Sequence, residues 1–354
     1  MGYVDYDKIL SYTQADLYFI TGARSTGKTF GARLIANDRY NKAQAIEKDT
    51  GRFCIFTRYA KNKETIERGF FDKIQQEGYL KDYTFYWRTH RCYRKHKDSD
   101  TAEIVGYCVA LTDLGITKEE TFAGVKNGTI IFDEVALDRR DVFHRYLKDE
   151  YSFYFLNMVN SVLRENNAKD SNVKIILLAN AVDMTCPYYD AFGLTYNMLA
   201  EHGTYWALDK AVLFVNAENE AAEETANNTI VGRLSARTQA RKMMFENKYE
   251  DDNTDFIAQK PATAVFMSAI FFGGTTFAFW YDNSMWYVNE KAPQGQGKTY
   301  TLMLDDNTIN YQAVRKADPI VNNVVRAHYG ARLRYCNPQV EAKFKRFLKF
   351  VGVV

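Results

Sequence analysis

One segment of the sequence combines glycines, a lysine and a hydroxyl at the spacing of a phosphate-binding loop. It reads Gly22-Ala23-Arg24-Ser25-Thr26-Gly27-Lys28-Thr29. Glycines permit a tight turn and a close approach of the backbone, and amides at the start of the following helix point at the phosphates. In this pattern Lys28 reaches the β- and γ-phosphates and Thr29 ligates Mg²⁺. The eight residues therefore predict a binding site for ATP and Mg²⁺.

Two carboxylates follow a later apolar run, Thr129–Phe132. In an open α/β sheet, ligands bind at the carboxyl ends of the strands. Asp133 would hold Mg²⁺ through water, and Glu134 would polarise the attacking water. The pair therefore favours nucleotide hydrolysis over a simple kinase reaction, and a cap on the following helix is the alternative.

Three further residues are candidates for the same site. Arg24 lies inside the loop, where it could touch phosphate, meet a neighbouring subunit or stay solvated. Asn180 follows the apolar run Lys174–Ala179. In P-loop motors with a strand added between those of the two motifs, a polar residue there senses the γ-phosphate; a turn residue is the alternative. Arg164 ends an amphipathic stretch and is either an arginine finger for the next subunit or a solvated cation.

Cations and aromatic residues alternate within residues 83–109, which we predict to form an inserted hairpin with a charged tip. The cations that could contact DNA are Arg88, Arg91, Arg94, Lys95 and Lys97. Such a patch suits contacts to a phosphate backbone, or a loop that faces a pore. A solvated loop tip is the alternative interpretation.

Short apolar runs and longer amphipathic stretches alternate in the first two hundred residues. The runs predict strands at Leu17–Thr21, Phe53–Thr57, Thr129–Phe132 and Lys174–Ala179. The stretches predict helices over residues 28–40, 63–76 and 153–165. This alternation is typical of an α/β domain with a mainly parallel sheet.

A polar segment, residues 216–228, divides the chain, since it holds four glutamates among Ala and Asn and no basic residue. Runs typical of antiparallel strands follow it, and basic helical segments come last. We expect a P-loop ATPase domain at 1–207, a linker at 208–234 and a smaller α+β domain at 235–354.

The composition limits the class of protein. The chain has 354 residues, 46% of them hydrophobic, and a net charge of +2. It is therefore an ordinary globular chain on which any nucleic-acid surface must be local. Five widely spaced cysteines fit reduced thiols, and we recognise neither a signal peptide nor an apolar run of membrane-spanning length. We expect an intracellular protein.

These motifs together carry a resemblance to a family. The chain resembles the DNA-packaging (encapsidation) ATPases of small tailed phages with protein-primed linear genomes, which are terminase-like P-loop motors. The matching segments are Leu10-Ser11-Tyr12, Gly22-Ala23-Arg24, Gly27-Lys28-Thr29, Ile131-Phe132-Asp133-Glu134, Val162-Leu163-Arg164 and Asn180-Ala181-Val182, with a weaker match at Gly232-Arg233-Leu234.

The resemblance implies an additional-strand P-loop domain and a C-terminal nuclease-like (RNase H-like) domain that has lost catalysis and binds DNA or the portal. It implies a homo-oligomeric ring, usually a pentamer, that moves double-stranded DNA into a procapsid. It leaves open an adaptor RNA or protein. The site of action would be the host cytoplasm, transiently at the portal vertex. Arg164 falls on the trans-acting arginine, and Lys118 and Lys126 are both candidates for a trans-acting lysine.

These features admit three functions. The leading hypothesis is a packaging motor whose catalytic residues are Lys28, Glu134 and Arg164. A DNA helicase or another DNA-remodelling P-loop ATPase is the alternative, and a nucleotide-gated scaffold without turnover is the third. After Ser235 the strand-associated acids are sparse, namely Asp282, Asp305 and Asp306. Because a nuclease needs several acids around two metals, we predict no nuclease activity.

Overall fold

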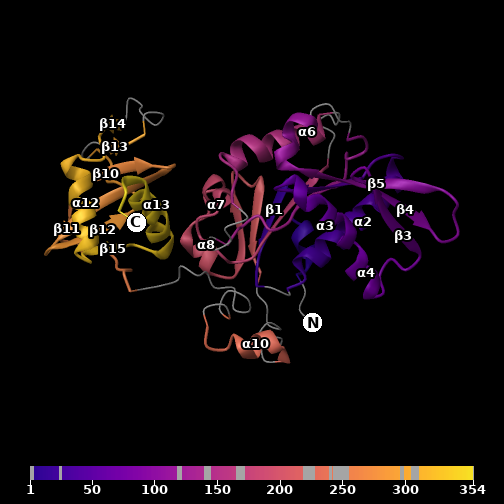
Figure 1. The fold of residues 1–354 in the computed structure, drawn as a ribbon, viewed down its shortest axis with the longest axis horizontal. Helices are drawn as coiled ribbons and strands as arrows, with labels where there is room; N and C mark the ends of the chain where they lie inside the picture. The colour runs from indigo at the N-terminus through magenta and orange to yellow at the C-terminus, as the bar shows by residue number, and fades with distance from the viewer. Residues whose placement is uncertain are drawn as a thin grey trace. The chain divides into compact units, whose positions relative to one another are not determined.

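The computed structural model describes residues 4–23, 26–117, 122–138, 145–164, 172–217, 228–238, 241, 255–295, 299–303 and 311–353. The chain divides into two compact units, Met1–Tyr249 and Glu250–Val354. Figure 1 labels helices and strands of both units.

Within the described residues, nine strands of the first unit form one sheet. Their spatial order is β3 (Tyr83–Arg88), β4 (Arg91–His96), β5 (Ala102–Ala110), β2 (Phe53–Thr57), β6 (Thr129–Phe132), β7 (Lys174–Ala179), β1 (Leu17–Thr21), β9 (Val212–Asn216) and β8 (Gly203–Ala207). The six neighbouring strands β5, β2, β6, β7, β1 and β9 pair in parallel. At the two ends of the sheet, the pairs β3–β4, β4–β5 and β8–β9 are antiparallel. The mainly parallel sheet is thus confirmed, with the four predicted strands at its centre.

These central strands are almost continuously apolar because helices cover both faces of the sheet. One face packs on α1 (Tyr6–Leu10), α2 (Lys28–Ile46), α3 (Lys63–Gly69) and α4 (Asp72–Gln76). The other packs on η3 (Glu150–Phe155), α6 (Leu156–Leu163), α7 (Pro187–Ala191) and α8 (Tyr196–Ala200). Short segments η1 (Ala60–Asn62), η2 (Leu111–Asp113), α5 (Leu114–Thr117) and α10 (Ile230–Leu234) complete the described helices of this unit. No helix among the described residues combines the length and apolarity needed to cross a bilayer.

The stretch predicted as one helix over residues 63–76 forms two helices, α3 and α4. The chain breaks between them at Phe70 and Phe71, whose side chains are buried in the core with the Phe53 ring. Arg33 of α2 donates to the carbonyls of Gly69 and Phe70, at 3.1 and 2.9 Å. The break therefore buries two aromatic side chains while carbonyls at the helix end keep hydrogen-bond partners.

The charged segment predicted as a hairpin tip is itself a strand, β4. The turn lies at Thr89 and His90, which both adopt positive φ, at 49° and 60°. Two such residues are typical of the tight turn whose twist matches that of the adjoining strands. β4 lies between β3 and β5, so the insertion is three-stranded and its charges alternate between two faces.

The range predicted as a linker, 208–234, contains strand β9 and helix α10. β9 pairs in parallel with β1 over five residues and is buried along its length, because its apolar sequence fits the centre of a sheet. The boundary between the compact units falls at residue 250 rather than at 235. Residues 218–227, which carry the glutamates, lie outside the described part of the chain.

The second unit holds a six-stranded sheet within its described residues. Its order is β14 (Tyr311–Ala313), β13 (Thr299–Thr301), β10 (Val265–Phe272), β11 (Thr275–Asp282), β12 (Met285–Asn289) and β15 (Leu333–Tyr335). The helices α12 (Pro319–Tyr329) and α13 (Pro338–Val351) pack against it through a core that includes Phe277, Phe279 and Phe344. β10, β11 and β12 form the expected antiparallel meander, but the outer strands pair in parallel. The smaller α+β unit is thus confirmed.

Candidate nucleotide-binding site

Four neighbouring parallel strands end at the same edge of the first sheet. In spatial order they are β1, β7, β6 and β2, and the residues that follow them are Gly22, Asn180, Asp133 and Arg58. β7 separates the strand of the glycine loop from the strand of the two carboxylates, which is the arrangement of the additional-strand class. The topology therefore gathers the predicted motifs into one site.

The glycine loop leads from β1 into α2. Gly27 has φ of 76°, in the left-handed region that favours glycine, and immediately precedes the helix. Gly22 packs closely on Ala217, since a Cβ added to it would lie 3.4 Å from the Ala217 Cβ. Arg24 and Ser25 lie outside the described residues, so their predicted roles remain predictions.

The side chain of Lys28 lies inside the curve of this loop. Its Nζ donates to the carbonyls of Gly22 and Ala23, at 2.8 and 2.7 Å, and to the Thr26 hydroxyl at 3.1 Å. Lys28 is only 7% exposed. The ammonium is thus held at the concave face of the loop, where phosphate oxygens would be cradled.

A hydrogen bond joins the two predicted motifs directly. The Thr29 hydroxyl donates to Asp133 Oδ2 at 2.6 Å, although the residues are far apart in sequence. Hydroxyl and carboxylate oxygens suit Mg²⁺, which is usually held by one or two carboxylates together with nucleotide phosphates and water. The described residues contain no cluster of three or more acidic, His or Cys ligands. The Thr29–Asp133 pair therefore fits a metal shared with a nucleotide rather than an all-protein cage.

Glu134 has an unusual backbone conformation next to this pair. Its φ is 55°, and its side chain is exposed. A left-handed conformation costs a non-glycine residue roughly 1–2 kcal/mol and is often found at functional sites. The Glu134 amide donates to Asp133 Oδ1 at 2.8 Å, and the Val135 amide donates to the Leu178 carbonyl of β7 at 3.0 Å. The conformation is thus fixed from both sides.

A buried ion pair that the motifs did not predict, Arg58–Glu150, lies next to the backbone of Glu134. Arg58 Nε lies 2.7 Å from Glu150 Oε2, and its Nη2 lies 2.9 Å from Oε1. The same guanidinium donates to the carbonyls of Glu134 and Val135, at 3.3 and 3.0 Å. Desolvation alone would lower the pKa of Arg58, but the hydrogen bond and charge of Glu150 raise it overall. The sequence signal that could have revealed this ion pair is the position of Arg58 directly after an apolar strand.

The N-terminal helix packs over the start of α2. The Tyr6 hydroxyl donates to the Lys28 carbonyl at 2.6 Å, and the Val4 amide donates to the Thr26 carbonyl at 3.1 Å. Gly31 is required there, because a Cβ would lie 2.4 Å from the Tyr6 ring. Burial, with a smaller contribution from the charge of Asp133, raises the pKa of Tyr6 well above its usual value. Tyr6 therefore remains a neutral donor that supports the loop.

The other predicted residues of the site take separate places. Asn180 is half-buried at the end of β7, and its carbonyl accepts from the Val182 amide at 2.9 Å. Arg164 is exposed at the end of α6. Lys126 precedes β6, at the sheet edge opposite the loop, and pairs with Glu47 at 3.0 Å, while Lys118 lies outside the described residues.

Arg94 is a structural residue, so its predicted contact with DNA is wrong. The side chain is buried, and its Nε and Nη2 bond to Glu103 Oε1 at 2.9 and 2.7 Å. Nη1 donates to Asn37 and Asn41, at 2.9 and 2.8 Å. The guanidinium is therefore engaged on every nitrogen and is shielded from any partner.

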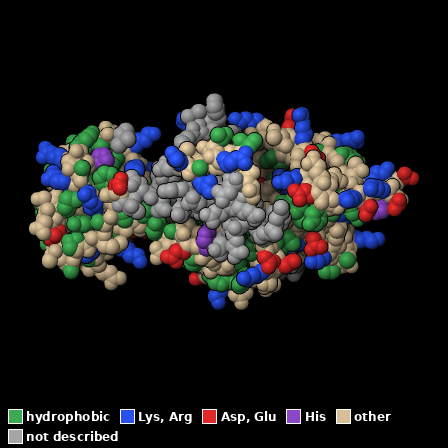
Figure 2. Space-filling view, turned by 90° about the horizontal axis from the view of Figure 1, so that it is seen from below, with side chains coloured by type: hydrophobic (Ala, Val, Ile, Leu, Met, Phe, Trp, Pro, Cys, Tyr) green, Lys and Arg blue, Asp and Glu red, His purple; other side chains and the backbone are tan. Residues whose placement is uncertain are grey.

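The remaining cations of the insertion are divided between its two ends. Arg88 and Arg91 are exposed and flank the turn, directly opposite one another. Lys95 and Lys97 lie toward the other end of β4, each 3.9 Å from an aspartate, Asp100 or Asp82. Figure 2 shows basic and acidic side chains side by side at the end of the first unit that holds the insertion. The insertion thus carries two small basic groups rather than one patch.

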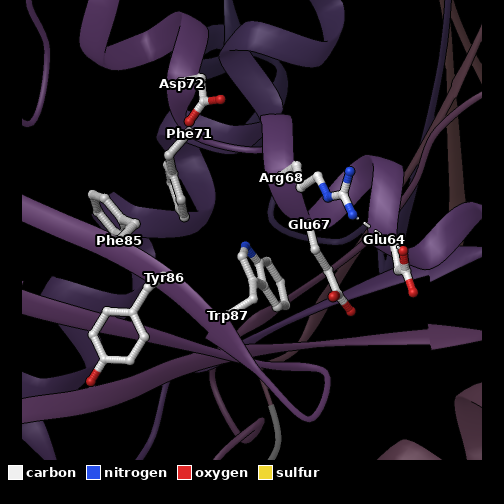
Figure 3. A pocket seen from close by; sticks show the side chains of 8 residues that line it. All are labelled: Glu64, Glu67, Arg68, Phe71, Asp72, Phe85, Tyr86 and Trp87. Carbon is white, nitrogen blue, oxygen red and sulfur yellow. Dashed lines mark hydrogen bonds and ion pairs between the residues drawn. The ribbon is translucent and has the colours of Figure 1, made fainter.

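A separate open pocket of about 350 Å³ lies beside the insertion, between α3, α4 and β3. Figure 3 shows the aromatic side chains of Phe71, Phe85 and Trp87 together with the carboxylates of Glu64 and Glu67. The acidic lining would repel a phosphate. We therefore do not place the nucleotide there.

Comparison with known proteins agrees with this architecture. The family model described as Podovirus DNA encapsidation protein (Gp16) matches residues 2–350. A DNA packaging protein of Bacillus phage B103 is 24% identical over 306 residues, which cover 86% of this chain and 84% of that protein.

Two solved structures share the fold over nearly the whole chain. A chain of the bacteriophage Phi-29 viral genome packaging motor assembly superposes with a TM-score of 0.72 at 20% identity, covering 99% of this chain and 100% of that one. The Phi-28 gp11 DNA packaging motor superposes with a TM-score of 0.57 at 15% identity, covering 98% and 97%. These likenesses establish the common two-unit fold.

Proposed function

Because the chain belongs to the podovirus DNA encapsidation protein (Gp16) family, a family of viral DNA packaging motors, we propose that it hydrolyses ATP at residues 22–29 to drive double-stranded DNA into a procapsid. The observation that carries the proposal is the 2.6 Å contact between Thr29 and Asp133, with Glu134 adjoining. It brings a phosphate-binding loop and a metal-binding carboxylate together beside a candidate base. Family membership does not favour the helicase alternative.

Each residue of the site has a distinct chemical task in this proposal. Lys28 and the backbone amides of the loop bind the phosphates, and Thr29 and Asp133 hold Mg²⁺. When bound, the metal neutralises charge on the phosphates. Glu134 orients the attacking water and accepts its proton, and Asn180 senses the γ-phosphate.

Arg164 acts on the nucleotide of a neighbouring subunit in this proposal. Its support is an exposed position at the end of α6, the helix that continues from η3, whose first residue Glu150 pairs with Arg58. An arginine supplied in trans stabilises the charge that develops during phosphoryl transfer. The active assembly is then a closed homo-oligomeric ring, for which a pentamer is proposed from the family resemblance.

The second unit is the proposed surface for DNA or for the portal. Among the described residues of this unit, the exposed cations are Lys291, Arg315, Lys316, Arg326, Arg332, Lys345, Arg346 and Lys349, and Figure 2 shows basic side chains scattered over this unit. A near-neutral chain can bind a polyanion through such a local excess. Arg88 and Arg91 are proposed as a further DNA contact. We place this activity in the host cytoplasm, transiently at the procapsid portal, with an adaptor RNA or protein left open.

The variant Glu134→Gln tests the proposed chemistry. It keeps the size of the side chain and removes its basicity. We expect ATP to bind to the variant with an affinity near that of the wild type, whereas phosphate release falls by about 10²–10⁴-fold. Phosphate release and equilibrium binding of labelled ATP are measured on the same preparations. Turnover at the wild-type rate would exclude Glu134 as the base.

A further inference from the structure

We propose that Arg58 and Glu150 form a latch that sets the position of Glu134 and links it to the helix that carries Arg164. Arg58 follows β2 and Glu150 begins η3. Neither residue belongs to the nucleotide-binding motifs, and neither is placed in contact with the nucleotide, so both are positioning residues. The inference rests on the proposed function, because it uses the roles given there to Glu134 and Arg164.

The backbone on the carboxyl side of Glu134 is supported by Arg58. The left-handed conformation of Glu134 is unfavourable for a residue with a Cβ and needs support from its surroundings. Arg58 supplies that support, since two of its nitrogens donate to the carbonyls of Glu134 and Val135. A guanidinium is planar and its donors are fixed relative to one another. Arg58 therefore fixes both carbonyls at once and with them the direction of the Glu134 side chain.

Arg58 is itself held in place by Glu150. Its side chain is 5% exposed and that of Glu150 is 0% exposed. Glu150 accepts from two guanidinium nitrogens, and its Oε2 also accepts from the Leu147 amide at 2.9 Å. A buried charge that lost its partner would be strongly unfavourable. Arg58 and Glu150 must therefore move together when either one moves.

A continuous helical segment joins Glu150 to Arg164. Glu150 starts a π-helical turn, η3, which continues without interruption into α6, and Arg164 caps that helix. Phe155 and Met158 anchor this helix in the same core cluster as Phe132 of β6. π-helical turns are rare and are often found at functional sites. A shift of the backbone at Glu134 is thus passed through Arg58 and Glu150 to the helix that carries Arg164.

The latch predicts a specific kinetic effect for Arg58→Lys in the full chain. Lysine keeps the positive charge opposite Glu150 but lacks the fork that holds both carbonyls. We expect kcat for ATP hydrolysis to fall by about 10²-fold, because the base is displaced, and KM to stay within about twofold. The matched control is Arg68→Lys, which alters an exposed pair with Glu64 and should leave both constants unchanged.

The link to Arg164 is tested by a double-mutant cycle. Glu150→Gln and Arg164→Ala are made singly and together, and kcat is measured for each. If Glu150 acts through the helix, the combined loss is smaller than the product of the two single losses. Losses that multiply would overturn the link between Glu150 and Arg164.

A second variant covers the case in which a single substitution does not fold, which thermal melting reveals. The pair Arg58→Met with Glu150→Leu removes both charges and keeps similar volumes, a change that buried ion pairs often tolerate. It is expected to fold and to bind labelled ATP as the wild type does, with kcat again lowered by about 10²-fold. Wild-type kcat in this pair would overturn the latch.

The outcomes separate the latch from the proposed function. Wild-type kcat in Arg58→Lys, with turnover lost in Glu134→Gln, overturns the latch alone. A raised KM with unchanged kcat in Arg58→Lys also overturns it, because that result assigns Arg58 to nucleotide binding. Undiminished turnover in Glu134→Gln removes the proposed function and the latch with it.

Discussion

The carboxyl edge of the first sheet and the β3–β4 hairpin both concentrate charged side chains, but they arrange them in opposite ways. At the edge, parallel strands end side by side, so Thr29 meets Asp133 at 2.6 Å. In the hairpin, successive side chains point to opposite faces. Arg94 is consequently buried against Glu103, while Arg91 is exposed at the turn. Parallel strand ends gather chemistry from distant segments, whereas an antiparallel pair separates charges that are neighbours in sequence.

The two regions also differ in what satisfies their charges. The edge brings together a lysine, a hydroxyl and a carboxylate, and we propose that a nucleotide binds there. In the hairpin, carboxylates nearby in the sequence lie close to several cations, as in the pairs Lys95–Asp100 and Lys97–Asp82. Exposed pairs of this kind contribute little to stability. The arrangement at the edge therefore suits a bound ligand, whereas several charges of the hairpin have partners within the protein.

The largest expected effect tests whether the proposed nucleotide site at the carboxyl edge needs an arginine from a neighbouring subunit. Arg164→Ala should fold and bind ATP, since the side chain is exposed at a helix end. Its rate of hydrolysis in the assembled ring should fall by about 10³-fold or more. Phosphate release is measured with DNA and procapsids present, with Arg68→Ala as the matched exposed control. Undiminished hydrolysis would show that the site needs no arginine from a neighbour.

The next effect separates the two faces of the hairpin. Arg94→Ala should lower the free energy of unfolding by about 2–4 kcal/mol, because it removes the donor to the side-chain oxygens of Asn37 and Asn41 and to Glu103 Oε1. Arg91→Ala should change it by less than about 0.5 kcal/mol. Urea unfolding measures both.

DNA binding completes this test of the hairpin. Arg91→Ala should weaken DNA binding about equally for all sequences and reduce the slope of log affinity against log salt by about 1. Salt titrations of DNA binding measure it. Equal losses of stability in the two arginine variants would contradict the assignment of opposite faces.

The smallest expected effect uses a thiol of the hairpin. Burial raises the pKa of Cys92 well above its usual value, so in the folded state the thiol stays protonated where the unfolded chain ionises. Because the folded pKa is raised, its contribution to stability is complete below about pH 8.5 and declines as the pH rises further. Between pH 7.5 and 9.5, Cys92→Ala should lose about 1 kcal/mol less than the wild type in urea unfolding. Identical losses of stability in the wild type and the variant would show that the Cys92 thiol is accessible to solvent in the folded state.

The sequence allowed the site to be predicted where its residues follow apolar strands. The strands at Leu17–Thr21 and Thr129–Phe132 were placed correctly, because strands buried on both faces read as short apolar runs. Each of these strands pairs in parallel with β7, which lies between them, and this brings Lys28 and Asp133 to one edge of the sheet. The family resemblance, confirmed by the match over residues 2–350, selected DNA packaging among the possible motors.

Other features depend on contacts that no local pattern reveals. The pairing of Arg58 with Glu150 joins residues that are distant in sequence, and nothing near either residue indicates the other. The burial of Arg94 depends on Asn37 and Asn41 of α2. The composition of the hairpin segment alone therefore suggested that Arg94 is an exposed cation. β9 was missed because the acidic residues that follow it dominated the composition of the predicted linker.

DNA encapsidation by Glu134→Gln tests the central claim most directly, namely that hydrolysis at this edge drives DNA into the capsid. Wild type and variant are each combined with procapsids, DNA, Mg²⁺ and ATP, and the DNA protected from nuclease is measured. The account expects the variant to bind ATP as the wild type does and to protect no DNA above the level seen without ATP. Protection equal to that of the wild type would contradict it.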